Sequence, residues 1–71
     1  MRKIRKRTLS LKAARVNAGL DRMNVVESLG ISAATLWNWE RGATSPPIAM
    51  AQRMADMYRV PLDEIAFYAQ D

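Results

Sequence analysis

The chain has 71 residues, which limits it to one domain near the smallest size at which an apolar core is stable without disulfides or metals. It contains no cysteine and no histidine, so disulfides are excluded and the usual protein ligands of zinc and copper are missing. Eleven lysine and arginine residues against seven acids give a formal net charge of +4, which favours a polyanionic partner such as nucleic acid.

The first expected segment is a basic N-terminal arm over residues 1–9. Five of its first seven residues are cations, namely Arg2, Lys3, Arg5, Lys6 and Arg7. Cations at this density favour contact with the phosphates of DNA or RNA, or with an anionic surface. The same run would also serve as a solvated tail, so charge alone leaves both interpretations open.

Residues 10–71 are expected to form a single all-α domain, a compact bundle of about five short helices. Glycines and prolines separate the helical segments, and no stretch alternates long enough to predict a sheet. The expected helices run from Ser10 to about Ala18, from Asp21 to Leu29, from Ser32 to Gly42, after Pro46-Pro47, and from Leu62 to about Ala69. The apolar stripe of the fourth helix is expected at Ile48, Ala51, Met54, Ala55 and Tyr58.

The second and third helices carry the functional prediction. Only Gly30-Ile31-Ser32 separates them, which requires a sharp turn with a left-handed residue at the glycine and a helix cap at the serine. Apolar residues fall where such a turn would bury them, at Val25, Leu29, Ile31, Leu36 and Trp39. The spacing is typical of a helix-turn-helix, whose second helix enters the major groove of DNA, although an ordinary pair of packed helices would share it.

The run LGISAATLWNWERGATSPP resembles the helix-turn-helix of the phage Cro and repressor family, also called the xenobiotic-response-element class. The resemblance spans roughly Leu11 to Ile65, and it includes Pro46 and the closing string Val60-Pro61-Leu62-Asp63-Glu64-Ile65. It implies a lambda repressor-like DNA-binding domain of the short Cro-like kind. It also implies an internal ion pair between Arg15 and Glu40, which would fix the first helix against the third.

Opposite Leu36 and Trp39, the third helix presents an outer face that would meet DNA. Together with its flanks, this face is expected to bind DNA through Arg22, Ser32, Ala33, Ala34, Thr35, Trp37, Asn38, Arg41 and Thr44. Asn38 can pair with an adenine edge, the alanines and Trp37 can touch thymine methyls, and Arg41 can reach phosphate or guanine. The resemblance implies the phosphate role of Arg22, because it occupies the family position that usually holds glutamine.

Two departures from the family pattern affect the scaffold. Val26 stands where the family commonly places alanine at a close helix crossing, and Arg59 stands where the family often has glycine. Extra methyl groups at the crossing predict a destabilisation of ~1–3 kcal/mol or a slightly wider crossing angle. An arginine at the end of the fourth helix predicts a more strained backbone at that helix end than glycine would give.

Two functions remain open. The first is a transcriptional regulator of phage or prophage type, which binds double-stranded DNA as a homodimer and acts by covering its operator. The second is a protein-binding modulator that engages a partner repressor, because Trp37 also suits a protein interface. Residues that could form that interface, or else complete the core, are Trp37, Met50, Met57, Phe67 and Tyr68.

Other classes of protein are not favoured. The scattered acids and the lack of histidine and cysteine predict no enzyme and no cofactor. No apolar run approaches the roughly 18 residues of a membrane span, and no signal-peptide core follows the basic start. A cytoplasmic protein without a second domain is therefore expected.

Overall fold

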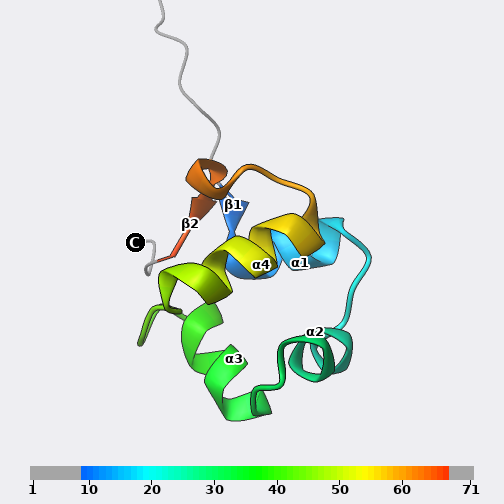
Figure 1. Ribbon diagram of the computed structural model, residues 1–71, viewed down its shortest axis with the longest axis vertical. Helices are drawn as coiled ribbons and strands as arrows, with labels where there is room; N and C mark the ends of the chain where they lie inside the picture. Colours follow the sequence, from blue (N-terminus) through cyan, green and yellow to red (C-terminus); the bar gives the residue numbers. More distant parts are fainter. Residues whose placement is uncertain (1–8, 68–71) are drawn as a thin grey trace, which may run out of the picture.

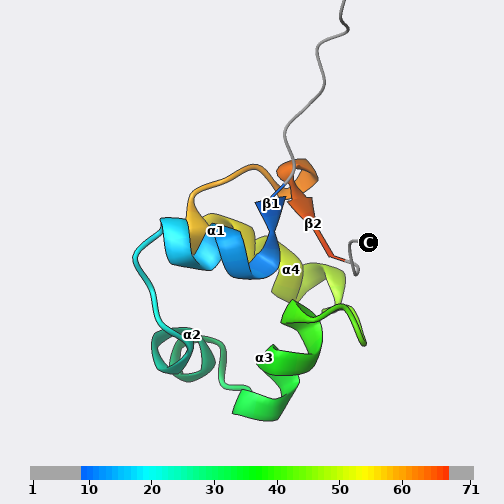
Figure 2. The same cartoon turned by 180° about the vertical axis from the view of Figure 1, so that it is seen from behind.

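Four α-helices dominate the computed structural model, which describes residues 9–67 (Figure 1). The helices are α1 (Leu11–Asn17), α2 (Arg22–Leu29), α3 (Ala33–Glu40) and α4 (Ile48–Tyr58), followed by the 3-10 turn η1 (Leu62–Glu64). Two short strands, β1 (Leu9–Ser10) and β2 (Ile65–Ala66), pair in parallel near the two ends of the described chain. Figure 2 shows from behind that α1 and α4 lie together, while α2 and α3 form the opposite end of the domain.

The expected fifth helix, from Leu62 to about Ala69, is wrong within the described range. Only Leu62–Glu64 are helical, as a single 3-10 turn, and Ile65 already has extended backbone angles. Leu9 then pairs with Ile65, and Ser10 with Ala66, so the expectation that no sheet forms is corrected as well. The pairing satisfies backbone groups while burying Ile65 and Ala66, and this tertiary contact overrides the local periodicity.

Three helices begin at the caps that the sequence predicts. The Ser10 hydroxyl accepts a hydrogen bond from the Ala13 amide at 3.0 Å, and the Ser32 hydroxyl accepts one from the Thr35 amide at 3.1 Å. Asp21 accepts from the Asn24 amide at 2.9 Å, and the Asn24 side chain accepts from the Asp21 amide at 3.0 Å. This reciprocal capping box satisfies the backbone amides of Asp21 and Asn24 at the start of α2.

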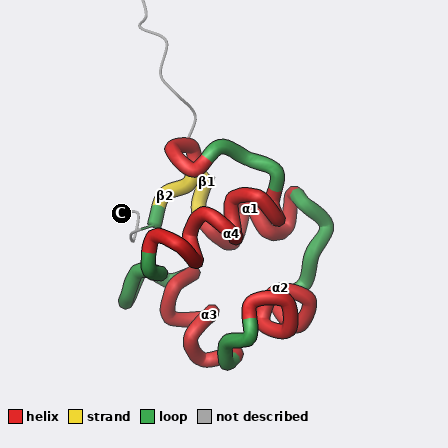
Figure 3. Tube along the Cα trace, in the orientation of Figure 1, coloured by secondary structure: helices red, strands yellow, loops and turns green. Residues whose placement is uncertain are grey.

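The core is built from buried side chains of all four helices, whose course along the chain Figure 3 traces. Its largest fully buried side chains come from one helix each, and they are Leu11, Val25, Leu36 and Met54. Along α4 the expected stripe is buried except for Ile48, which is 74% exposed. Ile48 is the first residue of that helix, directly after Pro47, and lies outside the core.

The ends of α2 and α4 require left-handed backbone. Gly30 ends α2 with φ 70°, as the sequence predicts for the turn. Arg59 ends α4 with φ 60°, and among residues 9–67 it is the one position other than glycine with a positive φ. A β-carbon is unfavourable in this region, so Arg59 holds the strained helix end that its place in the family pattern predicts.

No helix in residues 9–67 combines the length and the apolar character that crossing a membrane requires.

Candidate nucleic-acid interface

The turn between α2 and α3 spans only three residues. The amides of Gly30 and Ile31 both donate to the Val26 carbonyl, at 2.9 and 3.1 Å, which closes the last turn of α2. Ser32 then caps α3, so the chain changes direction without an intervening loop. Figure 1 shows α2 and α3 side by side at one end of the domain, the arrangement predicted from the sequence.

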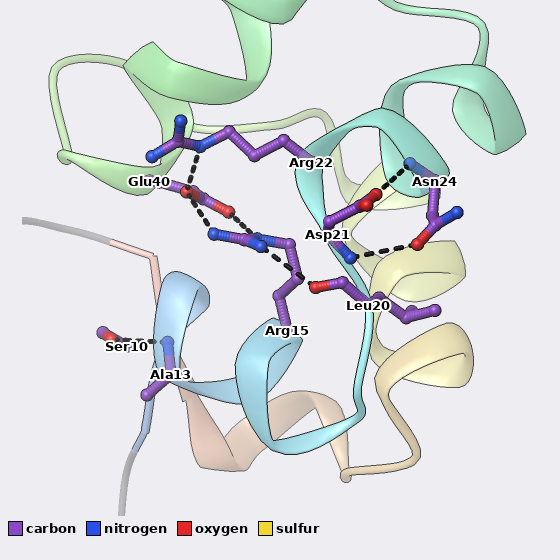
Figure 4. Close-up of polar contacts among 8 residues, drawn as sticks. All are labelled: Ser10, Ala13, Arg15, Leu20, Asp21, Arg22, Asn24 and Glu40. Carbon is purple, nitrogen blue, oxygen red and sulfur yellow. Dashed lines mark hydrogen bonds and ion pairs between the residues drawn. The ribbon is translucent and has the colours of Figure 1, made fainter.

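The inner side of α3 is fixed to α1 by a buried ion pair. Arg15 Nε donates to Glu40 Oε2 at 2.7 Å, and Arg15 Nη2 donates to Glu40 Oε1 at 3.4 Å (Figure 4). The remaining nitrogen, Nη1, donates to the Leu20 carbonyl at 3.0 Å, in the loop that leads to α2. One guanidinium therefore links α1, the loop before α2 and the end of α3. Its carboxylate partner, Glu40, is the residue that the family resemblance pairs with Arg15.

Tyr58, on α4, completes this inner region. Burial first, and the nearby Glu40 carboxylate second, raise the pKa of Tyr58 to about 12, although Arg15 acts in the opposite direction. The Tyr58 hydroxyl is buried and has no hydrogen-bond partner among residues 9–67. The raised pKa keeps the phenol neutral at pH 7, near the Arg15–Glu40 pair.

The outer face of α3 presents an aromatic ring, a guanidinium and an amide in contact with one another. Arg41 Cζ lies 4.4 Å from the centroid of the Trp37 ring, which is the geometry of a cation–π contact. Arg41 Nε also donates to Asn38 Oδ1 at 3.3 Å. Trp37 is 51% exposed and Arg41 is exposed, whereas Asn38 is half-buried. Arg41 and Asn38, the two side chains on this face best suited to hydrogen-bond DNA, are thus already bonded to each other.

The other residues expected to bind DNA surround this group. Ala33 and Ala34 are exposed in the first turn of α3, and Thr44 is exposed in the loop after it. Ser32 and Thr35 are engaged with each other, because their hydroxyls lie 2.9 Å apart and Ser32 also caps the helix. Their hydroxyls therefore have a structural role at the start of α3.

Arg22 is the first residue of α2, and its side chain reaches toward α3. Its Nε lies 3.5 Å from Glu40 Oε1, and 47% of the side chain is exposed (Figure 4). Glu40 therefore receives one arginine from its buried side and a second from its exposed side. Arg22 stands at the helix start, directly after the Asp21 carboxylate that caps α2.

The sequence analysis missed two cations, one that lines a surface hollow and one that joins two helices. Lys12, exposed on α1, lines a shallow hollow of about 180 Å³ together with Arg22, Trp37, Glu40 and Arg41. Its signal was its spacing three residues before Arg15, which puts both side chains on neighbouring positions of one helix. Arg53, on α4, donates to the Ser28 carbonyl at 3.0 Å and so ties α4 to the last turn of α2.

The residues proposed for a protein interface divide into two groups. Met50, Met57 and Phe67 are half-buried and pack against the core, so Trp37 is the one described member of this set that is largely exposed. Tyr68 lies outside the described residues. So do the arm cations Arg2, Lys3, Arg5, Lys6 and Arg7.

Comparison with known protein families gives a match over most of the chain. A family model described as a helix-turn-helix domain matches residues 9–67, which is most of the chain and includes both strands and all four helices. No curated protein and no solved structure matches the chain.

Proposed function

The chain belongs to the helix-turn-helix domain family, and from this premise we propose that it is a transcriptional regulator of the Cro and repressor type from a phage or prophage. It places α3 in the major groove of duplex DNA and regulates by occupying its operator. One observation carries the proposal. The buried Arg15–Glu40 pair fixes the inner side of α3, while Ala34, Trp37 and Arg41 stay exposed on its outer side.

The chemistry of each side chain determines the contact with DNA that we expect of it. Asn38 and Arg41 offer hydrogen bonds to base edges or phosphates, and the small Ala33 and Ala34 allow close approach to thymine methyls. Arg22 and Thr44 flank the helix and contact the backbone, which fixes register without reading sequence. A homodimer would read two half-sites, since one motif covers few base pairs.

A protein-binding modulator is the second candidate. The observation that favours it is the large exposed area of Trp37 beside two alanines, on a face where Asn38 and Arg41 are already bonded to each other. Exposed tryptophans are frequent anchors of protein interfaces. In this alternative, the protein engages a partner repressor with the same face of α3.

The test is a mobility shift on the DNA upstream of the protein's own gene, first with this protein alone and then with a partner repressor added. A dissociation constant at least about a thousandfold below that for unrelated duplex supports operator binding. A shift that requires the partner supports the modulator instead.

A matched pair of variants assigns the binding to α3. Ala34 and Ala49 are exposed alanines, and each is the second residue of its helix, so a glutamate suits both helix starts equally. We expect Ala34→Glu to abolish the shift by placing a negative charge against DNA, and Ala49→Glu to retain it. Equal effects of the two variants would contradict the placement of α3 in the groove.

A further inference from the structure

We propose that a hollow between the C-terminal ends of α1 and α4, the α1–α4 hollow, binds small molecules that carry a carboxylate on an apolar body. Figures 1 and 2 both show these two helix ends side by side. The volume of the hollow is about 660 Å³, within the ~300–1,000 Å³ of typical small-molecule sites. All of its lining residues belong to α1, α4 or the loops that follow them, so it is separate from the outer face of α3.

The wall of the α1–α4 hollow is mostly apolar. Tyr58 is buried, and four further apolar side chains are only half-buried, namely Ala18, Leu20, Met57 and Val60. A hydrocarbon that covers half-buried apolar groups is bound favourably, because the contact removes their remaining surface from water. Met57 can also adapt its shape to a ligand, since its side chain is unbranched and flexible. The wall therefore favours an apolar body.

Arg59 supplies the charge of the α1–α4 hollow. Among the described residues that line it, Arg59 is the only one ionised at pH 7, because the raised pKa of Tyr58 keeps that phenol neutral. Arg59 is exposed, and its guanidinium has no hydrogen-bond or ion-pair partner in residues 9–67. A guanidinium matches the two oxygens of a carboxylate with two parallel hydrogen bonds. Asn17 also lines the hollow and offers a further donor.

The backbone of Arg59 is an independent reason to assign a function to its side chain. Its φ of 60° is a left-handed conformation that disfavours any residue with a β-carbon. An arginine within the last turn of a helix complements the helix dipole without this strain, so the dipole alone does not account for Arg59. Strained residues cluster at ligand-binding sites, and here the strained residue carries the charge of the hollow.

Two lining residues lie next to the ion pair that positions α3. The Leu20 carbonyl accepts from Arg15 Nη1 at 3.0 Å, and the same guanidinium binds Glu40. Tyr58 lies close enough to this pair for both of its charges to act on the pKa of the phenol. A ligand that contacts Leu20 and Tyr58 would therefore act on the pair that holds α3. We expect occupancy of the hollow to change the affinity for DNA, a consequence that rests on the proposed function.

The probe is octanoate, and octanamide is its neutral control with the same apolar body. NMR titration of the isotope-labelled, full-length protein measures the affinity and identifies the residues affected. We expect octanoate to shift the amide signals of Ala18, Leu20 and Val60, with a dissociation constant of ~0.1–1 mM, which about ten non-hydrogen atoms can provide. Octanamide should bind at least about tenfold more weakly. Equal affinities would overturn the preference for a carboxylate, and shifts confined to other residues would overturn the site.

Two variants that each remove one cation test the role of Arg59. Arg59→Gly should weaken octanoate at least about tenfold and leave octanamide unchanged, and the protein stays folded because glycine relieves the left-handed strain. Lys12→Gln is the matched control, since Lys12 is exposed on α1 and does not line this hollow. It should leave octanoate binding unchanged. Equal losses in the two variants would mean general attraction between charges and would overturn the site.

The effect on α3 is measured with a duplex that the full-length protein selects from a random pool. Saturating octanoate should change the dissociation constant for this duplex at least about fivefold in the wild type and should have no effect in Arg59→Gly. An unchanged wild type would overturn the coupling between the hollow and α3. A wild type that selects no sequence contradicts the proposed function, whereas the NMR titrations test the ligand site independently of that result.

Discussion

Arg15 and Glu40 form an ion pair that is closed to solvent, with Nε and Oε2 2.7 Å apart and only 7% and 5% of the two side chains exposed. Burial makes each charge dependent on the other, because neither can recover its hydration in the folded protein. The pair also sets the position of α3, since the same guanidinium binds the loop before α2. Its removal should therefore affect both stability and DNA binding.

The first prediction concerns this pair. Arg15→Ala should lower the free energy of unfolding by ~3–5 kcal/mol, because Glu40 is left buried without its main partner. Urea denaturation followed by tryptophan fluorescence measures the change. The double variant Arg15→Met with Glu40→Leu should recover most of the loss, since two apolar side chains need no partner there. An unchanged urea midpoint for Arg15→Ala would show that the ion pair does not contribute to stability.

The second prediction concerns pH. The pKa of Tyr58 is raised to about 12 in the folded protein, so the unfolded chain loses this proton first, near pH 10. Its contribution is therefore fully present below about pH 10 and is lost as the pH rises toward about 12. Tyr58→Phe should show a shallower loss of stability across this window, and it should be neutral or stabilising at pH 7 because the buried hydroxyl has no partner among residues 9–67.

Near-ultraviolet absorbance of tyrosinate provides the check on that interpretation. In a Tyr68→Phe background, which leaves Tyr58 as the one tyrosine of the chain, ionisation of Tyr58 should coincide with the loss of helical circular dichroism at high pH. A tyrosine signal at Tyr58 that titrates near pH 10 while the helices stay intact would contradict the raised pKa.

The third prediction concerns the end of α4. Arg59→Gly should stabilise the protein by about 0.5–1 kcal/mol, because the relief of the left-handed strain exceeds the added freedom of the unfolded chain. Thermal denaturation measures the gain. Arg59→Asn should give a smaller gain and controls for the lost charge, and Arg59→Val should destabilise. A stabilising valine would show that φ is not the source of the effect.

Much of the motif could be predicted from local sequence. The caps at Ser10, Asp21 and Ser32 and the glycine turn at residue 30 depend only on neighbouring residues, so the sequence identifies them directly. The separation of α3 into inner and outer faces follows from helical spacing, and burial of Leu36 and Trp39 confirms the inner side.

The features that the sequence analysis missed depend on contacts between distant segments. The extended backbone at Ile65 requires Leu9 as its partner, and the residues around Ile65 contain no local signal of that pairing. The hollow containing Lys12 exists only because α1 packs against α3. The contact of Arg22 Nε with Glu40 was not predicted either, because it is set by the angle between α2 and α3.

The fourth prediction concerns the basic arm. Deletion of residues 1–7 should flatten the dependence of log K on log salt by about 0.9 for each phosphate contact that the arm makes. Fluorescence anisotropy with a labelled duplex at several salt concentrations measures the slope. The thermal midpoint of the deleted protein serves as the control, since β1 begins after the deleted residues. A slope that the deletion does not change would reject a role for the arm in DNA binding.

The pairing of β1 with β2 has a consequence for the order of folding. The hydrogen bonds of helices α1 to α4 join residues that are close in sequence. Leu9 can pair with Ile65 only after the whole intervening chain has become compact. Closing so long a loop has a large entropic cost, so we expect this pairing to form after the main barrier to folding. Weakening it would then accelerate unfolding and leave the rate of folding nearly unchanged. The lifetime of the native domain would thus depend on a pairing between the two ends of the described chain, far from α3 in the sequence.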